Sequence, residues 1–126
     1  MNWWLMLAGT VITVTAIAHS YLGERHILIR LFRKDLPILF GSDWFTRRTL
    51  RFAWHLTTLA WIGFGQMLFS FAQIPIDRGA KLACDMIVGA AVLSGILTFG
   101  ATDGRHRAWI AFFLVAFATY MGAIPR

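Results

Sequence analysis

Four long apolar segments, separated by short polar stretches, dominate the pattern of hydrophobic and polar positions along the chain. A helix needs roughly 20 apolar residues to cross a hydrocarbon core about 30 Å thick. Each of these segments carries at most one ionisable side chain. The pattern therefore predicts an all-α, polytopic membrane protein, a bundle of four transmembrane helices with spans at about residues 3–22, 52–76, 82–102 and 108–124.

The segment after the first expected span has a different pattern. At the helical angle of about 100° per residue, His26, Arg30 and Arg33 lie on the stripe of His19, and apolar residues lie on the opposite face. This basic amphipathic segment between the first two spans is either an extension of the first helix or a separate helix at the membrane surface. Pro37 is expected to end it, because proline disfavours helical geometry in the residue before it.

Very little of the chain lies outside the four apolar segments. With 58% of 126 residues apolar, residues 1–126 are expected to form a single membrane domain. Ala16-Ile17-Ala18 imitates a signal-peptidase site, but no basic residue precedes the apolar run, so we expect the first span to be retained.

The basic residues are distributed unevenly between the two sides that such spans define. Nine of them fall in the first and third connections, against three in the second connection and at the end of the chain. Under the positive-inside rule, both termini are therefore expected on the periplasmic side. The formal charge of +6 is explained as a topology signal with a role in lipid contact, and a nucleic-acid partner is not expected.

All four histidines fall at one depth under this topology, near the cytoplasmic ends of the spans. His19 and His55 are the deepest, and His26 and His106 lie at the headgroup level, where they are expected to be exposed. Ionisable side chains at such depths are costly and usually face the bundle interior or a cavity. The sequence therefore predicts a cytoplasmic-side polar layer, to which Glu24 also belongs.

The leading functional hypothesis is that this layer binds a cofactor through His19 and His55. Imidazole is a common metal ligand and a frequent axial ligand of tetrapyrroles, so two rings from neighbouring helices suit a haem-like group. With Glu24 and His26 added, the same residues suit a metal ion such as zinc or iron. The alternative reading is that both histidines have structural roles.

Glu24 needs a partner in either conformation of its segment. If the first helix continues, Glu24 turns away from His19 and a neighbouring helix must satisfy its charge. If the chain breaks at Gly23, the carboxylate can turn toward His19 or pair with Arg48 or Arg51. Near the opposite surface, Asp85 is expected to pair with Lys81, one helical turn earlier.

Two further functions remain open. A lipid-headgroup enzyme or carrier would use the basic residues for phosphate, and an accessory or assembly subunit would dock on a larger membrane complex or on another copy of itself. Small residues recur every four positions in the last two spans, which is typical of close helix packing in lipid. The expected headgroup contacts are Arg30, Arg33, Arg47, Arg48 and Arg51.

The segments His19-Ser20…Gly23-Glu24 and Arg51…Trp54-His55 resemble a pattern in small four-helix proteins of bacterial inner membranes. The resemblance covers the first two spans. It implies a location in the bacterial inner (cytoplasmic) membrane and no particular activity.

Overall fold

The computed structural model describes residues 1–124 and shows helices without strands over that range. Helix α1 (Trp3–Gly23) runs on through a π-helical turn, η1 (Glu24–Leu28), into the short α2 (Ile29–Leu31). The basic amphipathic segment is therefore an extension of the first helix. The long helices are α1 (Trp3–Gly23), α3 (Trp44–Phe71), α4 (Arg78–Ala101) and α5 (Ala108–Ala123).

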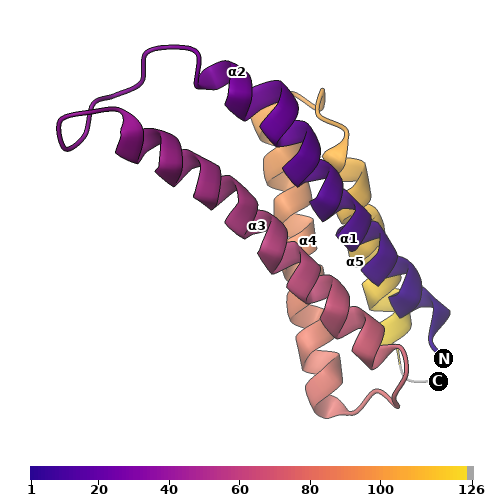
Figure 1. Ribbon diagram of the computed structural model, residues 1–126. Coiled ribbons are helices and arrows are strands. Elements are labelled where there is room, and N and C mark those ends of the chain that lie inside the picture. The colour runs from indigo at the N-terminus through magenta and orange to yellow at the C-terminus, as the bar shows by residue number, and fades with distance from the viewer. Residues whose placement is uncertain (125–126) are drawn as a thin grey trace.

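The four long helices pack as a row in the order α3, α1, α5, α4. Helix α1 packs against both α3 and α5, and α5 packs against α4, whereas α3 and α4 make little contact. Figure 1 shows the start of α1 and the end of α5 at one end of the molecule, with α2 and the α4–α5 connection at the other end. Because α1 lies inside this row, its side chains meet two neighbours, and it carries much of the core.

The core is built from small residues and a few large ones. Leu5, Leu68 and Val115 are fully or almost fully buried, and alanines fill the space between α1, α5 and α4. A side chain at Gly122 would meet Leu5, and one at Gly95 would meet the ring of Phe113. The small-residue packing expected in the last two spans is thus present.

Asn2 ties three helices together at the end where α1 starts and α5 ends. Its side-chain oxygen accepts a hydrogen bond from the Leu5 amide at 3.4 Å and so caps α1. Its side-chain nitrogen donates to the Gly122 carbonyl at 2.7 Å, and its backbone N–H donates to the Ala72 carbonyl at 2.7 Å. These bonds satisfy polar groups at the ends of α1, α3 and α5.

Arg47 closes the connection between α2 and α3. Its guanidinium donates to Asp43, to the Phe32 carbonyl and, at 3.3 Å, to the Lys34 carbonyl. The hydrogen bond from Arg47 lowers the pKa of the Asp43 carboxyl, so the pair stays ionised at neutral pH. The turn at Gly41 has a positive φ of 85°, which glycine adopts without strain.

The helix of the second apolar segment starts before the expected span and ends within it. It begins at Trp44, so the chain is already helical where the span starts near residue 52, and it ends at Phe71 instead of near residue 76. The early start places two turns of cationic residues inside the helix, where hydropathy alone does not reveal them. The early end follows from Pro75, because proline disfavours helical geometry in the residue before it.

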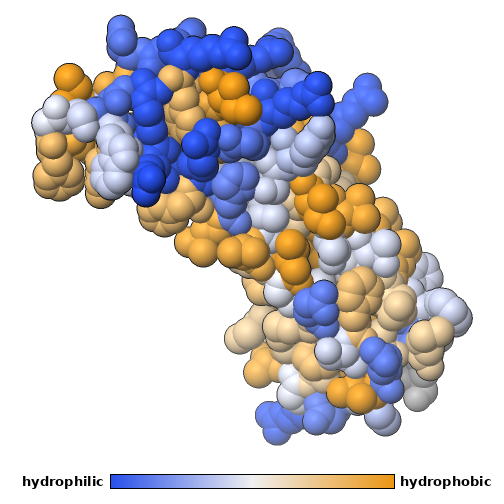
Figure 2. Space-filling view, in the orientation of Figure 1, coloured by the Kyte–Doolittle hydropathy of each residue, from blue (hydrophilic) through white to orange (hydrophobic). Residues whose placement is uncertain are grey.

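Within residues 1–124, two helices are long and apolar enough to cross a membrane: the continuous helix Trp3–Leu31 and α4. Helix α5 is apolar but shorter, and α3 carries more polar residues than α1, α4 or α5. Large apolar side chains are nevertheless exposed along all four long helices. Figure 2 shows hydrophilic residues gathered over α2 and the start of α3, with hydrophobic residues below them. The four-span arrangement stays a prediction.

Candidate functional site

A cluster of polar side chains joins α1 to α3 where the two helices lie side by side. His55 of α3 contacts two side chains of the first helix. Its Nδ1 lies 2.6 Å from Ser20 Oγ, and its Nε2 lies 3.3 Å from Glu24 Oε2. The exposed fraction of the His55 side chain is 37% and that of Glu24 is 29%, so the cluster is half-buried and reachable from outside.

The contact with Glu24 fixes the direction of both hydrogen bonds when His55 is neutral. A carboxylate only accepts, so the ring proton lies on Nε2 and points to Glu24. Nδ1 then carries the lone pair, and the Ser20 hydroxyl must donate to it. The arrangement thus runs from hydroxyl to imidazole to carboxylate.

Arg51 completes the cluster one turn before His55 on α3. Its NH2 lies 2.8 Å from Glu24 Oε1, and its Nε donates to Glu24 Oε2 at 3.3 Å. The guanidinium also lies 4.9 Å from the ring centre of Phe32, a cation–π distance. Glu24 is therefore satisfied by α3 although the first helix does not break at Gly23. The expectation that a neighbouring helix neutralises Glu24 is confirmed.

His19 has different surroundings from His55. Its ring stacks on Trp54 with centroids 4.5 Å apart and planes 5° apart, and it lies 5.1 Å from the ring of Trp61. Trp54 Nε1 donates to the His19 backbone carbonyl at 3.1 Å. His19 Nε2 is buried without a hydrogen-bond partner among residues 1–124. The His19 ring of α1 thus packs as an aromatic group against α3.

The close approach of α1 and α3 depends on Gly23. A Cβ atom at this position would overlap the indole of Trp54, which is already held against His19. The π-helical turn begins at the next residue, Glu24. The extra residue in this turn changes which side chains share a face, so the stripe expected from a regular helix does not extend through it.

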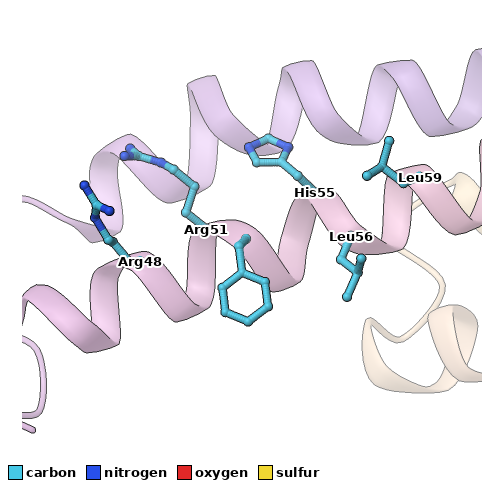
Figure 3. Close-up of a pocket in the computed structure, with 6 residues that line it drawn as sticks. Arg48, Arg51, His55, Leu56 and Leu59 are labelled. Carbon is cyan, nitrogen blue, oxygen red and sulfur yellow. The ribbon is translucent and has the colours of Figure 1, made fainter.

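Two grooves meet at His55, which lines both of them. One, of about 690 Å³, runs along α3 past Arg48, Arg51, Phe52, Leu56 and Leu59. Figure 3 shows Arg48, Arg51 and His55 following one another along α3, with Leu56 and Leu59 farther along. The other groove, of about 640 Å³, lies between the two helices and is lined by Ile17, Ser20, Tyr21, Glu24, Arg25, Ile29, His55, Thr58 and Ile62.

The expected metal ligands are not brought together as one set. Of His19, Glu24, His26 and His55, only Glu24 and His55 are in contact. His26 is exposed, and its ring Nδ1 lies 3.2 Å from the Leu22 carbonyl of its own helix. In the described part of the chain, no three His, Cys, Asp or Glu side chains lie close enough together to hold a metal ion.

The expected headgroup residues fall into three groups. Arg48 and Arg51 line the groove along α3, and Arg48 also lies 4.8 Å from the ring centre of Trp44. Arg47 is engaged in closing the α2–α3 connection. Arg30 and Arg33 are exposed at the end of the first helix. Of the five arginines, Arg51 therefore belongs to the polar cluster, and Arg48 lines the same groove as His55.

Ser20 and Trp54 belong to the segments that carry the resemblance, but the sequence did not predict their contacts in the site. Ser20 is one of several hydroxyl residues in apolar segments, and nothing in the pattern pairs it with His55. Trp54 reads equally well as a residue facing lipid. The Lys81–Asp85 pair near the other end, by contrast, has the expected partners, with Lys81 Nζ 2.7 Å from Asp85 Oδ2.

Comparison of the chain with protein-family models, with curated proteins and with solved structures finds no match.

Proposed function

We propose that this chain is a multi-pass protein of the bacterial inner membrane that binds an anionic lipid in the grooves beside α1 and α3. Arg48 and Arg51 bind the headgroup phosphate, and the apolar residues farther along α3 contact the acyl chains. The observation that carries this proposal is the order of residues along one groove, which is cationic at one end and apolar at the other.

The groove along α3 has the chemistry of an amphiphile. From Arg48 to Leu59 the helix advances about 16 Å, at the usual rise of 1.5 Å per residue. Arg48 has no carboxylate partner among residues 1–124, so its charge is free for an anion. Arginine suits phosphate because its planar guanidinium forms two parallel hydrogen bonds. The volume lies in the range of about 300–1,000 Å³ common for small-molecule sites.

The charge distribution supports an orientation for the bound lipid. The end with α2 and the α4–α5 connection holds nine basic and four acidic residues. In a membrane this end would face the cytoplasm, and both termini would face the periplasm. The groove then lies at the depth where acyl chains meet phosphates, with Arg48 and Arg51 on the headgroup side.

The geometry favours a lipid over a metal ion or tetrapyrrole. A haem between His19 and His55 would need both rings to face a shared gap. His19 is instead stacked against Trp54, and both ring nitrogens of His55 are engaged.

The test is native mass spectrometry of the full chain in a mild detergent, after extraction from membranes containing phosphatidylglycerol and phosphatidylcholine. The wild-type protein should retain phosphatidylglycerol in preference to phosphatidylcholine. Arg48→Gln combined with Arg51→Gln should reduce that retention at least about tenfold, because two charge-assisted hydrogen-bonding groups are lost.

Arg105→Gln combined with Arg107→Gln provides the matched control. These residues are exposed in the α4–α5 connection at the same end of the molecule, and their substitution removes the same charge. Retention should be unchanged in this control. Equal loss in both double variants would show a diffuse effect of net charge, and the proposed site would then be wrong.

A further inference from the structure

Ser20, His55 and Glu24 form a chain of hydrogen bonds with a defined direction. With His55 neutral, the Ser20 hydroxyl donates to His55 Nδ1 at 2.6 Å, and His55 Nε2 donates to Glu24 at 3.3 Å. A hydroxyl bonded to a neutral imidazole that a carboxylate orients is the arrangement that activates serine nucleophiles. Here the carboxylate bonds Nε2 and the serine bonds Nδ1, which leaves the direction of proton transfer the same.

The position of Ser20 makes this arrangement more than a link between helices. Ser20 and His55 both line the groove between α1 and α3, together with Ile17 and Ile62. A serine in a helix usually bonds a carbonyl of the preceding turn, as Ser70 does with Gln66. Ser20 bonds His55 instead, so its hydroxyl oxygen is held against the imidazole. Ser20 also lines a groove of apolar character.

We propose that Ser20 is the nucleophile of an acyl-transfer site that acts on the ester-linked acyl chain of an anionic lipid. His55 is the general base, and Glu24 is a positioning residue that holds its tautomer. The lipid substrate class rests on the proposed function, whereas the reactivity of Ser20 rests on the geometry alone.

The reaction balances with water as the co-reactant. Ser20 Oγ bonds to the ester carbonyl carbon as its proton passes to His55 Nδ1. The bond to the alcohol oxygen then breaks, and His55 returns the proton to that oxygen. Water attacks the acyl-serine with His55 again as base, which releases the fatty acid and restores Ser20.

Tyr21 and Arg25 supply a donor for the negative charge that develops on the carbonyl oxygen. Both line the same groove as Ser20. Arg25 NH1 donates to the Tyr21 hydroxyl oxygen at 2.8 Å, which leaves the tyrosine proton free to donate to another acceptor. A hydroxyl polarised by a cation in this way is a suitable oxyanion donor.

The experiment uses the detergent-purified full chain and an alkyl fluorophosphonate, which loses fluoride as an activated serine bonds its phosphorus. Intact mass should show one adduct, and peptide sequencing should place it on Ser20. His55→Gln should slow the labelling at least about 100-fold, because the base is removed. Glu24→Gln should slow it at least about tenfold, because the tautomer is no longer fixed.

Ser20→Ala should abolish the adduct, and Ser70→Ala should leave it unchanged. Released fatty acid gives a second readout: the wild-type protein should hydrolyse phosphatidylglycerol faster than phosphatidylcholine, and Tyr21→Phe should lower the rate. No adduct on protein that still retains phosphatidylglycerol would overturn the nucleophile while leaving lipid binding intact. An adduct on Ser20 without lipid retention would overturn the lipid substrate, and with it the proposed function.

Discussion

At the scale of single residues, the contact between α1 and α3 depends on groups that each have two functions. Trp54 stacks on the His19 ring and donates to the His19 carbonyl. Arg51 pairs with Glu24 and lies over Phe32. His55 bonds one side chain with each ring nitrogen. A substitution at any of these positions therefore removes more than one interaction.

Trp54→Phe should lower the free energy of unfolding by about 1–2 kcal/mol, because it removes a hydrogen bond and part of the stacked area. Trp3→Phe is the control, since Trp3 is exposed, and this variant should stay within about 0.5 kcal/mol of wild type, as most surface substitutions do. Reversible unfolding in mixed detergent micelles measures both. Equal stabilities for the two variants would show that the Trp54 contact contributes nothing.

At the scale of the elements, α1 and α3 approach closely at three glycines. A Cβ at Gly9 would come within 2.8 Å of the Phe69 ring, and a Cβ at Gly65 would lie 3.3 Å from the Gly9 carbonyl oxygen. Gly23 makes the third such approach, against Trp54. Backbone proximity thus holds α1 to α3 around Gly9 and Gly65. Nearer to α2, the polar cluster around His55 holds the two helices together.

Gly23→Ala should destabilise the protein by about 1–3 kcal/mol, because the added methyl group must displace an indole that is already packed. Gly63→Ala, on the same pair of helices, has nothing within 4 Å of its added Cβ. It should be neutral or stabilising by up to about 1 kcal/mol, as expected when alanine replaces glycine in a helix. Thermal unfolding followed by circular dichroism distinguishes them, and a stable Gly23→Ala protein would contradict the packing described above.

The sequence predicts the long helices well and their limits less well. Continuous apolar runs predict α1, α4 and α5, because a helix in an apolar environment needs little besides apolar side chains. Hydropathy alone places the start of the second span near residue 52, although α3 begins at Trp44, because Arg47, Arg48 and Arg51 make its first turns polar. The π-helical turn at Glu24 has no marker in the sequence pattern.

The sequence also predicts part of the candidate site. Depth along each apolar segment places His19, Glu24 and His55 in one layer. Which of them touch depends on rotation of the helices about their axes, and Gly23 and Trp54 set that rotation. The layer was therefore predictable, whereas the Ser20–His55–Glu24 arrangement required the structure.

At the scale of the whole molecule, the start of α1 and the end of α5 lie at one end and most of the charge at the other (Figures 1 and 2). If the helices cross a bilayer, the two ends lie on opposite sides. Single cysteines at Ser42 and Arg105, made in a Cys84→Ala background, should react with an impermeant maleimide only after cell lysis. A cysteine at Gln73 should react with intact spheroplasts, and the reverse pattern would contradict the orientation.

The most direct measurement of the central claim is photo-crosslinking with phosphatidylglycerol that carries a diazirine in its acyl chain. In membranes containing the full chain, the crosslinks should map to residues 17–29 of the first helix and 52–62 of α3, and phosphatidylglycerol without the label should compete them away. Crosslinks spread evenly over the exposed faces of α4 and α5 as well would show ordinary lipid contact and contradict a lipid site beside α1 and α3.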